Sequence, residues 1–213
     1  KWNEHSNSAG PVIMNQESAR NYGKYLSDRL AQFDNVIWIL GGDSPIQTQV
    51  YADTVTAMAE GIRAGESGDR LMSFHPSGSG SSDIFHTAPW LDFNAIQTSH
   101  SKPNIPGYTY IERLYSKRLA KPCLDMEPNY EGSPMFIMGG LKEKPPYTAV
   151  FSAYDVRKSF YRSILAGAAG MTYGCEPIRQ LHRHNDRIHI FDYYDMPTWE
   201  EALSAPGSSQ LGM

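Results

Sequence analysis

The sequence predicts an α/β fold with a parallel β-sheet, because five short apolar runs alternate with segments of helical periodicity. Each run is followed by a polar residue at the point where a parallel strand would end. No phosphate-binding pattern of the GxGxxG or GxxxxGKS/T type follows the first run, which disfavours an open doubly wound sheet. Polar residues at the strand ends instead favour a TIM (β/α)8 barrel.

The predicted strands cover residues 36–40, 71–75, 93–98, 122–126 and 168–173. The first of them, Val-Ile-Trp-Ile-Leu, is continuously apolar, so we expect it to be buried on both faces. Pro76 closes the second strand, and the Gly/Ser-rich stretch that continues to Ser82 is predicted to be a long loop on the functional face. A complete barrel needs eight strands and about 250 residues. Five predicted strands are too few, so either the N-terminal strands are absent from this sequence or the fold is not a barrel.

The predicted helices cover residues 16–32, 46–64, 108–119, 154–165 and 198–203. Thr198 is the expected N-cap of the last one. The inner face of the first helix is predicted to hold Tyr22, Tyr25, Leu26, Leu30 and Phe33, and that of the second Val50, Val55, Met58, Ala59 and Ile62.

Composition excludes some classes of partner. The net charge of −4 offers no basic surface for nucleic acid, and no apolar run approaches the roughly 20 residues of a membrane span. The aromatic content of 12% suits either stacking against sugar rings or a large aromatic core, and Trp38 and Trp90 favour the core. The two cysteines, Cys123 and Cys175, form neither a disulfide framework nor a zinc motif, and we expect two buried thiols.

Polar side chains that could carry chemistry follow the predicted strands. They are Asp43, His75, Gln97 with His100, Glu127 and Tyr173. In a barrel, such residues face one mouth. Two carboxylates among neutral donors and aromatic rings are typical of a glycoside hydrolase, in which one carboxyl group protonates the leaving oxygen. The other attacks the anomeric carbon or activates water.

Other interpretations of these residues stay open. Asp43 could cap the helix that follows it, each histidine could be a hydrogen-bonded structural residue, and Gln97 could be a core amide. A metal-dependent barrel hydrolase could use Asp43, His75, His100 and Glu127 as ligands, although no HExxH pair is present. A third possibility is a non-catalytic carbohydrate-binding module on a glycosidase fold.

Six segments, in order along the chain, resemble the motifs of one enzyme family. They are NVIWILGGD (35–43), FHPSG (74–78), WLDFNAIQTSH (90–100), KPCLDMEPNYEG (121–132), YDVR (154–157) and GAAGMTYG (167–174). From about residue 16 to the C-terminus, the sequence resembles the apiosidase-like glycoside hydrolases of family 140, also labelled DUF4038.

This resemblance implies that residues 1–213 form part of a TIM-barrel catalytic domain, covering roughly strands four to eight, with the N-terminal strands absent. It also implies that Asp43, on strand four, is the acid/base and that Glu127, on strand seven, is the nucleophile of a retaining enzyme. In such an enzyme, the two carboxyl groups lie about 5–5.5 Å apart.

The resemblance further implies that the sugar is held by His75, Gln97, His100, Tyr130 and Tyr173. The expected reaction releases a terminal, apiose-like sugar from a plant or microbial polysaccharide, without a cofactor or metal. A secreted, periplasmic or cell-surface location is expected, and we expect the small C-terminal β domain usual in the family to be missing from residues 1–213. Thr98 and the pair Cys175 and Glu176 depart from the family pattern, which affects the expected sugar.

Overall fold

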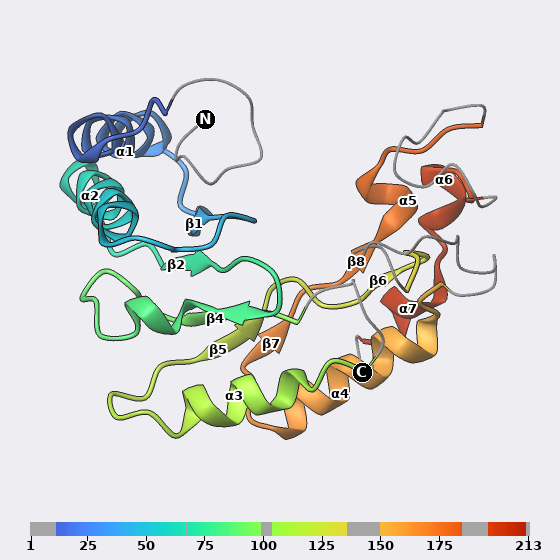
Figure 1. Ribbon diagram of the computed structural model, residues 1–213. Helices are drawn as coiled ribbons and strands as arrows, with labels where there is room; N and C mark the ends of the chain where they lie inside the picture. Colours follow the sequence, from blue (N-terminus) through green and yellow to red (C-terminus); the bar gives the residue numbers. More distant parts are fainter. Residues whose placement is uncertain (1–11, 67, 99–103, 136–149, 185–195, 212–213) are drawn as a thin grey trace. The chain divides into compact units, whose positions relative to one another are not determined.

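The computed structural model describes residues 12–66, 68–98, 104–135, 150–184 and 196–211 (Figure 1). The chain divides into two compact units: unit 1 is Lys1–Ala95 with Lys117–Pro122, and unit 2 is Ile96–Ser116 with Cys123–Met213. Helices and short strands alternate in both units, so the predicted α/β fold is confirmed at this level.

Unit 1 contains a complete β–α–β segment. Strand β1 (Trp38–Gly41) leads into helix α2 (Gln49–Gly65) and then into strand β2 (Met72–His75). The two strands pair in parallel, with Trp38 opposite Met72 and Gly41 opposite His75. Helix α1 (Gln16–Leu30) lies beside α2 (Figure 1). The parallel pairing predicted from the apolar runs is confirmed here.

The core of unit 1 confirms the structural interpretation of the two tryptophans, because Trp38 and Trp90 are both buried in it. The expectation that β1 is buried on both faces is wrong: Ile39 is 38% exposed, and burial alternates along the strand. Val50 is also exposed, because it lies in the first turn of α2, ahead of the buried stripe.

Helix α1 confirms only part of its predicted inner face: Leu26 and Leu30 pack, partly buried, against the core of unit 1. Its buried residues are the small ones, Ala19, Gly23 and Ser27, while Tyr22 and Tyr25 are exposed. These three residues are spaced four apart and therefore lie along one side of the helix. Small side chains allow two helices to approach closely, so the contact with α2 is made without the tyrosine rings.

The rest of unit 1 is built from short elements. The predicted Gly/Ser-rich loop includes the two-residue strand β3 (Gly80–Ser81), followed by a 3-10 helix, η1 (Ser82–Phe85). Strand β4 (Asn94–Gln97) begins in this unit, where the Ser82 hydroxyl accepts the backbone N–H of Ala95. His86 is buried against Asn94, and its Nε2 lies 3.1 Å from the carbonyl oxygen of Arg118, so this histidine is structural.

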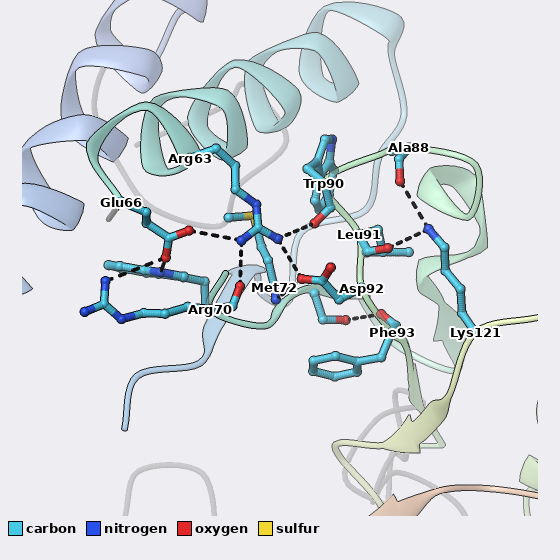
Figure 2. Close-up of polar contacts among 12 residues, drawn as sticks. Arg63, Glu66, Arg70, Met72, Ala88, Trp90, Leu91, Asp92, Phe93 and Lys121 are labelled. Carbon is cyan, nitrogen blue, oxygen red and sulfur yellow. Dashed lines mark hydrogen bonds and ion pairs between the residues drawn. The ribbon is translucent and has the colours of Figure 1, made fainter. Parts of the chain in front are cut away.

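A polar network holds α2 to the beginning of β2 (Figure 2). Arg63 donates to Glu66 at 3.0 Å and to Asp92 at 2.6 Å, and Asp92 also accepts the backbone N–H of Met72 at 2.7 Å. Lys121 donates to the carbonyl oxygens of Ala88 and Leu91. Asp92 of the WLDF motif and Lys121 of the KP motif therefore bind backbone groups and fix their positions in unit 1.

Unit 2 contains a second β–α–β segment. Strand β5 (Cys123–Asp125) and strand β7 (Gly170–Met171) are parallel, with helix α4 (Ala153–Leu165) between them in sequence. Strands β6 (Tyr130–Glu131) and β8 (Gly174–Cys175) form another parallel pair. Helix α3 (Gly107–Tyr115) lies alongside α4 (Figure 1).

Several boundaries in unit 2 differ from prediction. The predicted helix 108–119 ends at Tyr115, and Leu119 has a φ of 64°, which an α-helix does not accommodate. The predicted strand 168–173 is shorter, and β8 follows it. Three short helices complete the unit: α5 (Glu176–Arg179), α6 (Trp199–Ala202) and α7 (Pro206–Ser209). Thr198 caps α6 as expected, in a capping box with Glu201.

Both cysteines are buried free thiols, as expected. Burial and the neighbouring Asp125 charge raise the pKa of Cys123 to about 12, so this thiol stays protonated. Within the described ranges, no helix is long and apolar enough to cross a membrane.

The network around Asp92 leads to a stability prediction. Replacing Asp92 with alanine leaves the Arg63 guanidinium and the Met72 N–H without this acceptor, so we expect the free energy of unfolding to fall by about 2 kcal/mol. The control is Asp28→Ala, which removes an exposed i,i+4 ion pair with Lys24. This variant should change the free energy of unfolding by less than about 0.5 kcal/mol. Urea unfolding of the purified variants measures both, and equal effects would contradict a structural role for Asp92.

Candidate active site

Asp43 follows β1 through a turn that requires glycine. Gly41 has a φ of 90°, and a Cβ there would lie 2.6 Å from the carbonyl oxygen of His75. The N–H of Gly42 donates to that same oxygen, which leaves Asp43 exposed just beyond the strand. The N-cap of α2 is Thr48, whose side chain accepts the N–H of Tyr51, so the interpretation of Asp43 as the helix cap is wrong.

His75 lies at the end of β2, half-buried, in the same unit as Asp43. Its Nδ1 is 2.9 Å from the carbonyl oxygen of Pro76. A carbonyl oxygen can only accept, so Nδ1 carries the proton and Nε2 is the acceptor atom of the neutral ring. The β1 and β2 ends therefore bring Asp43 and His75 to the carboxyl side of one parallel pair.

Gln97, Glu127, Tyr130 and Tyr173 belong to unit 2, whereas His100 lies outside the described residues. Gln97 is the last residue of β4 and is buried. Glu127 is also buried, at 8% exposure, two residues beyond the end of β5. Pro128 follows it and cannot donate to a sheet ladder, so strand pairing does not resume until β6 begins at Tyr130.

Tyr173 contacts Glu131, the second acid of this stretch. Its hydroxyl donates to Glu131 Oε2 at 2.6 Å, and the N–H of Gly207 donates to the same oxygen at 2.9 Å. Burial, and secondarily the Glu131 carboxylate, raises the pKa of Tyr173, so the phenol keeps its proton. Glu131 thus ties β6 to the start of α7, which agrees with a structural role for this carboxylate.

Arg179 is a neighbour of the predicted site that the sequence interpretation missed. Its guanidinium lies 5.8 Å from the centre of the Tyr130 ring and donates to Glu176, whose side chain is completely buried. Burial lowers the pKa of Arg179, but the Glu176 bonds and the charges of Tyr130 and Glu127 outweigh it and raise the pKa overall. In the sequence, the i,i+3 spacing of Glu176 and Arg179 after a predicted strand could have identified Arg179 as a member of an ion pair.

Asp125, on β5, is the most deeply buried carboxylate near Glu127. It is 0% exposed, and the Thr98 hydroxyl donates to its Oδ2 at 2.8 Å. Burial raises the pKa of Asp125 to about 6, although the donors around it favour the ionised form. Asp125 is therefore largely ionised at neutral pH.

The described residues contain no group of three or more His, Cys, Asp and Glu side chains that could hold a metal ion. His182 and His184, which have the spacing of an HxH motif, do not form such a group either. His182 Nδ1 lies 2.9 Å from the carbonyl oxygen of Pro197, and His184 is exposed.

The chain is similar to two solved structures of glycoside hydrolases. One, a glycoside hydrolase, is 32% identical with a TM-score of 0.78; the similarity covers 93% of this chain and 45% of that one. Another, a glycoside hydrolase of family 5 from Bacteroides vulgatus, is 32% identical with a TM-score of 0.79 over 93% of this chain and 43% of that one. The chain thus spans less than half the length of these glycoside hydrolases.

The family follows from the sequence as a whole. Residues 1–213 match the family described as "Apiosidase-like, catalytic domain", and the chain belongs to it. The resemblance found from the six motifs is therefore confirmed. No curated protein matches the chain significantly.

The buried Asp125 makes stability depend on pH. Its pKa of about 6 in the folded state lies above the ordinary value of 3.8, so its stabilising contribution is complete below about pH 3.8 and is lost as pH rises through 6. We expect the difference in unfolding free energy between the wild type and Asp125→Asn to fall by roughly 1–2 kcal/mol from pH 5 to pH 8. Urea unfolding at both pH values tests this, and a difference independent of pH would contradict it.

Proposed function

We propose that the protein is a retaining glycoside hydrolase in which Glu127 is the nucleophile and Asp43 the acid/base. One observation carries the proposal: in a chain of the apiosidase-like family, each carboxylate lies two residues beyond the C-terminal end of a strand in a parallel pair. In a TIM barrel, that end of the strands carries the catalytic residues. We propose that the chain supplies roughly strands four to eight of such a barrel.

The proposed reaction has two steps. Glu127 attacks the anomeric carbon while Asp43 protonates the departing oxygen, which gives a covalent glycosyl–enzyme intermediate. Asp43 then takes a proton from water, and the water oxygen displaces Glu127. His75, Gln97, His100, Tyr130 and Tyr173 are proposed to hold the sugar hydroxyls and ring. For Tyr130, the supporting observation is its ring, whose centre lies 5.8 Å from the Arg179 guanidinium.

The proposed substrate is a plant or microbial polysaccharide with a terminal apiose-like sugar, cleaved outside the cytoplasm: in the periplasm, at the cell surface or after secretion. The family description supports the sugar, and the glycoside hydrolase neighbours support a carbohydrate substrate. A screen of the full-length protein on defined pectic oligosaccharides identifies the released sugar.

Replacing Glu127 tests the proposed mechanism. We expect Glu127→Gln to lower kcat by at least about 10³-fold, because the amide is not a nucleophile. Glu127→Ala should be partly rescued by azide, a small anion that can enter the space left by the carboxylate and form the glycosyl azide. The matched control is Glu112→Gln, on the exposed side of α3, which should retain wild-type activity.

Turnover by a folded Glu127→Gln variant at the wild-type rate would refute the role of Glu127. Glycan binding by the wild type, with no turnover on any oligosaccharide, would instead identify a binding module.

A further inference from the structure

Asp125 joins separate segments of unit 2 around the strand end that carries Glu127. It is the last residue of β5 and is completely buried. Thr98, at the end of β4, donates twice: its hydroxyl to Oδ2 at 2.8 Å and its backbone N–H to Oδ1 at 3.4 Å. Ser163, a buried residue of α4, also favours the ionised form of Asp125 and so acts to lower its pKa.

A single residue, Met126, separates Asp125 from Glu127. Met126 is fixed on both sides, since its N–H donates to Ile96 and its carbonyl oxygen accepts from the Thr172 hydroxyl. Glu127 itself lies between the end of β5 and the start of β6, and Pro128 after it has no N–H to donate. With Asp125 held by Thr98, the chain is therefore fixed up to the peptide that carries the Glu127 side chain.

The cluster leaves little room to move. Gly107, the first residue of α3, packs directly on it: a Cβ there would lie 2.2 Å from Thr98 Cγ2 and 3.9 Å from Asp125 Oδ2. A buried carboxylate is tolerated only where donors surround it, and each donor here comes with a fixed segment of backbone. Removing one acceptor oxygen would therefore let the Glu127 peptide shift without emptying the core.

We infer that Asp125 is a positioning residue for catalysis: by accepting two hydrogen bonds from Thr98 it fixes the end of β5, and so holds the Glu127 carboxylate, two residues further on, at the point from which it attacks. The inference rests on the proposed function of Glu127 as nucleophile. Its consequence is kinetic, because a displacement of about 1 Å of a reacting group can lower the rate by about 10²-fold. Substrate affinity depends on other side chains and should change little.

The principal test is Asp125→Asn in the full-length protein, assayed on the oligosaccharide that the wild type cleaves. The amide keeps the size of the side chain but replaces an acceptor oxygen with a donor that faces other donors. We expect kcat to fall by about 10- to 100-fold and KM to stay within about threefold. A folded variant with kcat within about twofold of wild type, or with the loss confined to KM, would overturn the inference.

A second pair of variants keeps the test decisive if Asp125→Asn does not fold. Thr98→Val removes one hydroxyl donor and Thr98→Ser restores it. We expect kcat to fall several-fold in the valine variant, with KM unchanged, and to recover in the serine variant. Equal kcat values in both would overturn the inference.

Glu127→Gln, assayed in parallel, separates this inference from the proposed function. Activity in Glu127→Gln would refute the nucleophile assignment and, with it, this inference. An inactive Glu127→Gln beside a fully active Asp125→Asn would refute only the positioning role.

Discussion

Unit 2 depends on a carboxylate that has no contact with water. Asp125 is buried at the end of β5, where the hydroxyl and the backbone N–H of Thr98 donate to its two carboxylate oxygens. An isolated buried charge would cost several kcal/mol, so Thr98 and the end of β5 can adopt few other arrangements while Asp125 is ionised. Asp92 in unit 1, whose side chain is 33% exposed, also accepts from Arg63 and from the N–H of Met72, but at the start of a strand instead of the end.

This difference in position separates two kinds of residue within the family-like motifs. Asp92 contacts the backbone at the beginning of β2, and Lys121 contacts carbonyl oxygens of the loop before β4, so both hold the scaffold together. Asp43 and Glu127 each lie two residues beyond the end of a strand. The positive φ of Gly41 turns the chain before Asp43, and Pro128 cannot continue a ladder after Glu127. A short motif can therefore contain both a structural and a chemical carboxylate.

Much of the fold could be predicted from the sequence, because parallel strands and amphipathic helices leave periodic patterns. The parallel pairs and the Thr198 cap are such cases. Contacts between elements leave no such pattern: α1 buries Gly23 instead of Tyr25, and Ile39 is exposed although its run is apolar throughout. For the site, strand ends identified the candidate acids, but Arg179 and the partners of Asp125 depend on contacts between distant segments.

The central claim is that Glu127 forms a covalent bond to the sugar. A 2-fluoro analogue of the released sugar, with a good leaving group, slows both steps and lets the glycosyl–enzyme accumulate when its formation remains the faster one. Mass spectrometry of the digested full-length protein then locates the label. We predict one sugar per protein molecule, attached to Glu127. A label on Asp125 or Glu131, or hydrolysis with inversion and no adduct, would contradict the account.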